Sequence, residues 1–101
     1  MSHQNIKNYQ KPPLKLVKAI ISTFSNGQIK EAIIKIEELI KEYPSESLLL
    51  NISGSFHQSN GQLDDAVIRF KKALTLNSNY LEAHYNLGVT LRELGQTEEA
   101  I

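Results

Sequence analysis

The chain has 101 residues, equal numbers of basic and acidic side chains (11 Lys and Arg against 11 Asp and Glu), and no cysteine. This length is typical of a single domain and is too short for a two-domain enzyme. The absence of cysteine excludes disulfide scaffolds, thiolate zinc sites, iron–sulfur clusters and thiol nucleophiles. Because the charge is balanced, the composition gives no reason to expect nucleic acid or an anionic membrane as a partner.

Residues 1–12 are expected to form a polar N-terminal tail. Within residues 1–11 the only large apolar side chains are Ile6 and Tyr9, so the apolar core of a secretory signal is missing. Elsewhere the longest strongly apolar runs, such as 48–50, have three or four residues, whereas a membrane span needs about 18–20. We therefore expect a cytoplasmic protein that has no membrane partner.

Amphipathic helices are predicted after the tail. The first covers 14–25, following a pair of prolines, and the second covers 29–42 and ends before Pro44. The second has apolar side chains at offsets 0, 3, 4, 7, 10 and 11, which is the spacing of one helical face. The segment that starts at Leu63 has apolar side chains at the same offsets and is predicted to be its counterpart.

Further helices are predicted over 48–59 and 82–93. The dipeptides Asn26-Gly27, Asn60-Gly61 and Leu94-Gly95 are predicted to form left-handed turns between paired helices. Thr97, followed by two glutamates, is typical of a helix N-terminus, so a new helix is expected to begin there.

An internal repeat of 34 residues relates these helices. Ser25-Asn26-Gly27-Gln28 recurs as Ser59-Asn60-Gly61-Gln62, and the same shift leads to Gly95-Gln96. Alanines 32, 66 and 100 follow the same shift, as do glycines 54 and 88. Self-similarity at such a period is typical of stacked repeat architectures.

With two helices in each 34-residue unit, the sequence resembles the tetratricopeptide repeat (TPR) family, over about 2.6 repeats. The stretch Tyr85–Ile101, YNLGVTLRELGQTEEAI, is the closest to the family pattern. The resemblance implies an all-α fold, an α-α superhelix of antiparallel helix hairpins. It divides the chain into units at 13–46, 47–80 and 81–101, of which the last is truncated. Whether the chain is complete or the N-terminal fragment of a larger TPR-containing protein is left open.

Small residues are expected where the two helices of a hairpin approach closely. We expect Gly54 to face Ala66 and Gly88 to face Ala100. The first unit has Ala19 followed by Ile20 at the equivalent place, so it is predicted to be an atypical, capping repeat.

The family resemblance also implies that the first helices of the units line a concave, peptide-binding groove. Within it, Asn86 resembles one step of the asparagine ladder of O-linked N-acetylglucosamine transferase repeats. The Lys and Asn pattern that clamps a C-terminal carboxylate in chaperone-binding members is absent. The groove side chains implied are Leu14, Val17, Lys18, Ile21, Phe24, Ser25, Leu48, Asn51, Ile52, Ser55, Gln58, Ser59, Glu82, Tyr85, Asn86, Val89, Arg92 and Glu93.

The remaining polar residues are interpreted as structural. His57 and His84 are expected to be semi-buried packing residues, because no third ligand follows at metal-binding spacing. The acid pair Glu37-Glu38 is not expected to perform acid–base chemistry, because adjacent residues on a helix do not face one another. The cluster formed by Arg69 with the two following lysines is expected on a solvated helix face. No catalytic, metal or cofactor site is predicted.

Three functions stay open. The leading hypothesis is a non-catalytic scaffold that binds a protein or peptide. The second is the N-terminal repeat region of a larger glycosyltransferase- or sulfotransferase-type enzyme. The third is self-association: with only five residues after the turn predicted at Gly95, the apolar face with Leu87, Leu91 and Leu94 would remain bare, which favours a homo-oligomer, for example a homodimer.

Overall fold

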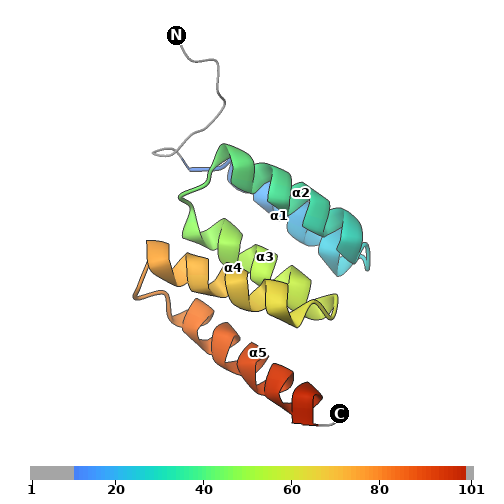
Figure 1. Ribbon diagram of the computed structural model, residues 1–101. Helices are drawn as coiled ribbons and strands as arrows, with labels where there is room; N and C mark the ends of the chain where they lie inside the picture. The colour runs from blue at the N-terminus through green and yellow to red at the C-terminus, as the bar shows by residue number, and fades with distance from the viewer. Residues whose placement is uncertain (1–10, 100–101) are drawn as a thin grey trace.

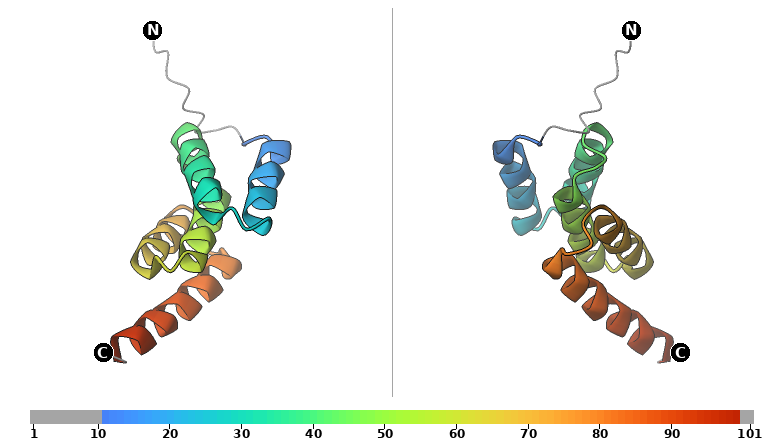
Figure 2. Two further views of the ribbon diagram at one scale, coloured as in Figure 1. Left: turned by 90° about the vertical axis from the view of Figure 1, so that its right-hand side faces the viewer. Right: turned by 90° about the vertical axis from the view of Figure 1, so that its left-hand side faces the viewer.

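The computed structural model describes residues 11–99, with side chains described up to Gln96. Every regular element in this part of the chain is a helix. The helices follow one another through space in chain order, and α3 lies between α1 on one side and α5 on the other (Figures 1 and 2). Their bounds are α1 Leu14–Ser25, α2 Ile29–Glu42, α3 Ser47–Ser59, α4 Leu63–Leu76 and α5 Leu81–Glu99.

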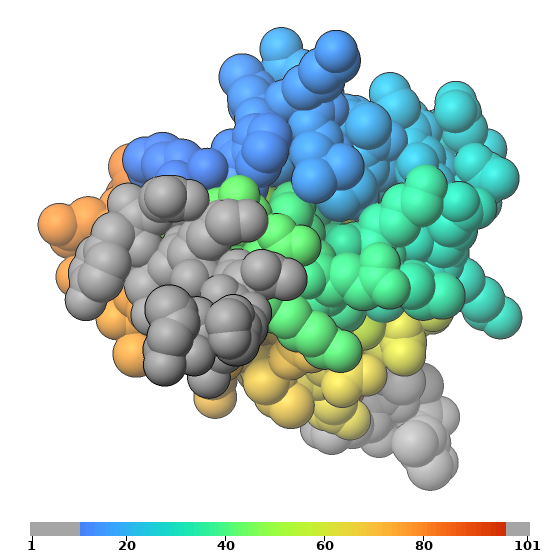
Figure 3. Space-filling view, turned by 90° about the horizontal axis from the view of Figure 1, so that it is seen from above, coloured from blue at the N-terminus to red at the C-terminus, as the bar shows by residue number. Residues whose placement is uncertain are grey.

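This architecture confirms the predicted all-α fold of antiparallel helix hairpins. The pairs α1–α2 and α3–α4 fall within the first two predicted units, although the boundaries of those units stay predictions. Seen from above, α1 forms one flank of the molecule and α4 the opposite flank, with α2 between them (Figure 3). The first ten residues of the predicted tail lie outside the described residues.

The turns within the first two units are as predicted. Gly27 has φ 89° and Gly61 has φ 78°, the left-handed region that glycine enters without steric cost. In each turn the residue after the glycine donates its backbone N–H to a carbonyl five residues earlier: Gln28 to Thr23, and Gln62 to His57. These bonds satisfy carbonyl groups that the end of a helix would otherwise leave unpaired.

The prediction of a third turn is wrong. Helix α5 continues through Leu94 and Gly95 to Glu99, so Thr97 lies within a helix and does not begin one. A helical glycine is only about 0.5–1 kcal/mol less favourable than alanine, so a Leu-Gly pair permits a turn without requiring one. In the first two units a second helix that packs against the first favours the reversal, and α5 has no such described partner.

The apolar core lies along the axis of the stack. Its larger part joins α1, α2 and α3, and its smaller part joins Leu50 of α3, Ala73 of α4 and Ala83 of α5. Every helix in the described region therefore buries one face against a neighbour. The buried residues of the larger part are Val17, Ile20, Ala32, Ile36, Leu39, Tyr43, Leu49, Ile52 and Phe56.

Close packing at Gly54 is as expected, but the group nearest to it is the ring of Phe70. A Cβ built at Gly54 would lie 2.5 Å from a carbon of that ring, and Phe70 is fully buried. Ala66 is also fully buried, yet it is not among the nearest atoms. Gly88 has no such neighbour within 4 Å, and its expected partner Ala100 lies outside the described residues.

Among the described helices, none is both long enough and apolar enough to cross a membrane.

Candidate functional site

A hollow of about 490 Å³ opens on the concave side of the stack, between α1, α3 and α5. One wall is the C-terminal half of α1, the floor is α3, and the opposite wall is the first turns of α5. Three helices from three different units thus contribute to a single surface. Its lining residues are Ile21, Phe24, Ser25, Leu48, Asn51, Ile52, Ser55, Phe56, Glu82 and Asn86.

The α1 side of the hollow is apolar. Phe24 stacks on Phe56 of α3, with ring centroids 4.4 Å apart and planes inclined by 11°. This stacking fixes the position of α1 relative to the floor, because aromatic pairs contribute about 0.5–1.5 kcal/mol beyond the area they bury. Beside the rings, Ile21 and Leu48 remain 41% and 37% exposed, so they offer apolar surface that a ligand would remove from water.

The α5 side of the hollow is polar and is tied to the floor by hydrogen bonds. Asn51 donates its side-chain amide to Oε1 of Glu82 at 3.2 Å and accepts a bond from the amide of Asn86 at 3.1 Å. Asn51 itself is only 4% exposed. One buried amide therefore orients two side chains one helical turn apart on α5.

A negative charge at this wall affects the neighbouring phenol. Burial raises the pKa of Tyr80, and the carboxylate of Glu82 raises that pKa further. Glu46 acts on the pKa of the same phenol in the same direction. Both carboxylates therefore act on the phenol of Tyr80, but only Glu82 lines the hollow, and Glu46 is paired with Lys11 at 3.9 Å.

Of the eighteen groove residues that the family resemblance implies, the structure brings nine together in the hollow, including Ile21, Asn51, Ile52, Ser55, Glu82 and Asn86. The others of this set are Phe24, Ser25 and Leu48. The remaining nine do not line it: Leu14, Val17, Lys18, Gln58, Ser59, Tyr85, Val89, Arg92 and Glu93.

The excluded residues differ in their surroundings. Val17 is 3% exposed and belongs to the core, because α1 packs this side chain onto its neighbours. Leu14 and Tyr85, in contrast, are 62% and 72% exposed and lie beyond the hollow. Sequence reasoning missed Phe56, which lines the floor. Its apolar spacing from Ile52, one turn earlier on the same helix, was a signal that could have identified it.

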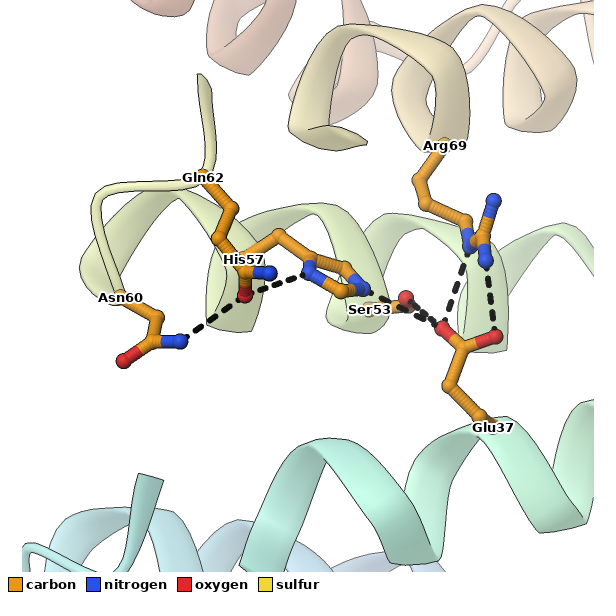
Figure 4. A network of polar contacts seen from close by, with 6 residues as sticks. All are labelled: Glu37, Ser53, His57, Asn60, Gln62 and Arg69. Carbon is orange, nitrogen blue, oxygen red and sulfur yellow. Dashed lines mark hydrogen bonds and ion pairs between the residues drawn. The ribbon is translucent and has the colours of Figure 1, made fainter. Parts of the chain in front are cut away.

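A polar network ties the first two units together on another side of α3 (Figure 4). Glu37 of α2 receives two hydrogen bonds from Arg69 of α4, at 3.1 Å from Nε and 2.9 Å from Nη2. Ser53 of α3 donates to the same carboxylate. The prediction of a solvated face for Arg69 is therefore wrong: its side chain, like that of Glu37, is less than a third exposed.

The network sets the charge state of Glu37. Burial raises the pKa of this carboxyl, but hydrogen bonds from Arg69 and Ser53 outweigh it and hold the pKa below its ordinary value. The hydrogen bonds to Glu37 likewise raise the pKa of Arg69. Both groups are therefore charged near neutral pH, and the geometry is that of a two-point Arg–carboxylate pair.

His57 lies at the edge of this network and is buried, as predicted. Its Nε2 is 3.5 Å from Oε2 of Glu37, within the distance of an ion pair but without a hydrogen bond. Its Nδ1 lies 3.1 Å from Oε1 of Gln62. The expectation for His84 is wrong, because this ring is exposed and its Nε2 lies 2.9 Å from the carbonyl oxygen of Ser78.

A second, smaller hollow of about 320 Å³ lies between α1 and α2, away from the predicted groove positions. Ion-binding chemistry has no support in the described region, because no three His, Cys, Asp or Glu side chains there are grouped as metal ligands. The residues that line the second hollow are Leu16, Ala19, Ile20, Thr23, Lys35, Glu38, Leu39 and Glu42.

Part of the chain matches a known repeat family. The family model described as TPR repeat matches residues 57–95, from the last three residues of α3 through α4 and most of α5. This match covers 39 of the 101 residues, and the five consecutively packed helices fit the architecture of a TPR-repeat protein. TPR repeats generally form non-catalytic scaffolds that bind proteins or peptides. The hollow at the concave side of this TPR stack is the candidate binding site.

Proposed function

We propose that this protein is a non-catalytic interaction module that holds a segment of a partner protein in the concave hollow. One observation carries the proposal: three helices from three repeat units bring residues of the implied groove together around about 490 Å³. A cavity of this size with mainly apolar walls and a few oriented polar groups is typical of a recognition site.

The binding energy would come mainly from the α1 side. An apolar side chain of the partner would cover Ile21 and Leu48, which now keep a large part of their surface in water. Burial of apolar surface contributes about 25 cal/mol per Å². Amide and carboxylate groups on the α5 side would then fix the orientation of the segment.

A selection from a random peptide library displayed on phage tests this proposal. Peptides that bind the wild-type chain should lose binding to an Ile21→Asp variant, because the new carboxylate would be buried against the ligand. Ile34→Asp is the matched control, since Ile34 is 60% exposed on α2 and does not line the hollow. Selected peptides that bind both variants equally well would contradict the proposal.

Self-association through α5 is a second candidate that a specific observation supports. Leu91 is 44% exposed, and Gly88, one turn earlier, has no neighbouring group within 4 Å of its missing Cβ. At the equivalent place in the second unit, α4 covers Gly54. We propose that α5 of a second copy covers the face formed by Leu87, Leu91 and Leu94, in an antiparallel pair with two-fold symmetry.

Light scattering over a range of protein concentrations tests the homodimer. The wild-type chain should dimerise as its concentration rises, and Leu91→Glu should keep it monomeric, because a buried carboxylate would face its own copy. Ile68→Glu is the control, since Ile68 is 55% exposed on α4, away from this face. A wild-type monomer at every concentration would rule this candidate out.

A further inference from the structure

We propose that the hollow selects a partner segment that carries a Lys or Arg beside an apolar side chain, with the cation held by Glu82 and Asn86. This inference rests on the proposed function and names the chemistry of the partner. It follows from three features of the hollow: the acceptors on its α5 wall, the sign of its charge, and the apolar surface opposite.

The α5 wall offers hydrogen-bond acceptors. Oε1 of Glu82 accepts a bond from Asn51, and the amide nitrogen of Asn86 donates to Asn51. Within the described region, Oε2 of Glu82 and Oδ1 of Asn86 accept no hydrogen bond from another residue. Because these bonds direct the Asn86 nitrogen toward Asn51, its side-chain oxygen is left for a ligand. A ligand group at this wall must therefore donate hydrogen bonds.

The charge at this wall has no described counter-ion. Glu82 is the only charged residue among those that line the hollow, and no described Lys, Arg or His forms an ion pair with it. Neither of the two predicted groove cations, Lys18 and Arg92, lines the hollow. A bound Lys or Arg would supply the missing charge, and hydrogen bonds between charged groups are about twice as strong as neutral ones.

The opposite side of the hollow suits the rest of such a segment. Lys and Arg have long aliphatic stems that pack on apolar surface while the charged end reaches a polar group. Leu48 and Ile52, between the two walls, provide that surface, and Ile21 with Phe24 would receive a neighbouring apolar side chain. Arg fits the paired acceptors best, because its planar fork presents parallel donors.

The acceptors are held in place before any ligand binds. Asn51 is 4% exposed and uses both ends of its amide, one toward each of the two α5 side chains. Asn51 is therefore a positioning residue, and Glu82 and Asn86 are the contact residues. Preorganisation of this kind lowers the entropic cost of binding. The polarity is the reverse of a carboxylate-binding clamp, so acidic segments should be rejected.

Sequencing the phage pools selected by three versions of the full chain tests the inference. The wild type should select peptides enriched in Lys or Arg next to Leu, Ile or Phe. Glu82→Gln should lose the Lys and Arg enrichment but keep the apolar one. Glu38→Gln is the matched control, because it removes an exposed carboxylate that does not line this hollow. It should select the same peptides as the wild type.

The affinity of one selected peptide for the wild type and for the Glu82→Gln variant tests the same inference quantitatively. Replacing its Lys or Arg with Gln should weaken binding to the wild type about tenfold, and should have much less effect on the Glu82→Gln variant. The affinity of the wild type should also fall as salt is added, because screening weakens an exposed ion pair. Circular dichroism of Glu82→Gln would verify that the helices are intact.

Each contrary result has a distinct meaning. Peptides that need Ile21 but show no Lys or Arg enrichment would overturn this inference and leave the proposed function standing. Peptides that are insensitive to Ile21→Asp, or no selected peptides at all, would overturn both. Peptide binding that weakens as the protein dimerises would indicate that a second copy of the chain occupies the hollow. That result would also overturn the inference.

Discussion

The second and third repeat units share the same glycines but not the same structure. Gly54 and Gly88 stand 34 residues apart, at equivalent places in α3 and α5. At Gly54 the ring of Phe70 lies so close that a Cβ would come within 2.5 Å of it, whereas Gly88 has nothing within 4 Å. A small residue thus permits close helix packing, but only a second helix with a large side chain makes use of it.

The glycines of the turns differ in the same way. Gly61 has φ 78° and reverses the chain between α3 and α4, while Gly95, 34 residues later, lies inside the continuous helix α5. The side chains that meet the neighbouring unit also change. Glu37, which contacts Ser53 and Arg69, is replaced at the equivalent place by Lys71.

Among the variants that test this comparison, Phe70→Ala is expected to have the largest effect on stability. The ring is fully buried against Gly54, so its removal should leave a cavity and lower the free energy of unfolding by about 3–5 kcal/mol. Ile68→Ala, on the same helix but 55% exposed, should change it by less than about 1 kcal/mol. Urea denaturation measures both. Similar losses for the two variants would show that the contact between Phe70 and Gly54 is not decisive.

Alanine at the two equivalent helix positions should have effects of opposite sign. Alanine is favoured over glycine in a helix by about 1 kcal/mol, so Gly88→Ala should stabilise the protein by up to that amount. At Gly54 the same gain should be outweighed by overpacking against Phe70, which typically costs about 1–3 kcal/mol. Thermal unfolding of the two variants measures the difference. If both stabilise the protein, the packing at Gly54 has room to spare.

A double variant identifies the source of the Gly54 penalty. In the background of Phe70→Ala the ring is gone, so adding Gly54→Ala should no longer be destabilising. Such non-additivity is expected only for residues in contact. A penalty that persists without the ring would trace to another neighbour of Gly54.

Alanine substitutions at the glycines of the predicted turns should change stability by smaller amounts, again with opposite signs at the two positions. Gly61→Ala places a side chain on a residue with φ 78°, which should cost about 1–2 kcal/mol. Gly95→Ala replaces a helical glycine and should raise stability by about 0.5–1 kcal/mol. Amide hydrogen exchange around residue 95 should slow in the second variant. Faster exchange there would indicate that the chain turns at Gly95 in solution.

Much of the fold follows from periodic features of the sequence. The 34-residue shift and the apolar spacing predicted the helices up to Leu76 and the turns at Gly27 and Gly61. These features are local or recur in each unit, so one chain contains several copies of the same signal. The interpretation of Leu94-Gly95 failed because a turn depends on what packs beyond it.

The features that could not be predicted depend on single contacts between units. Glu37 and Arg69 are 32 residues apart, which is not the repeat period, and each sits beside residues that suggest a solvated face. Val17 has the apolar character of a groove residue, and only the angle at which α1 packs places it in the core. The amide link from Asn51 to α5 likewise depends on how the units stack.

The smallest predicted effect concerns the acid sensitivity of the junction between the first two units. The pKa of Glu37 is lowered in the folded protein from an ordinary value of 4.5, mainly by hydrogen bonds that outweigh its burial. The stability it adds is therefore present above about pH 4.5 and is lost as the pH falls through the lowered value. Because the pair is partly exposed, we expect this contribution to be about 1 kcal/mol or less.

Urea denaturation at neutral and acid pH tests this with Glu37→Gln. The variant should be less stable than the wild type near neutral pH, and the difference should shrink as the pH falls below 4.5 and through the lowered pKa of the wild-type carboxyl. Glu31→Gln is the control, because Glu31 forms only an exposed pair with Lys35 one turn away on α2. It should keep the wild-type acid dependence. A difference between Glu37→Gln and wild type that is constant with pH would mean that Glu37 contributes through packing and not through its charge. The contacts of Glu37 with Ser53 and Arg69 would then differ from the contacts of α5 only in the shape of the packed groups, and not in their charge.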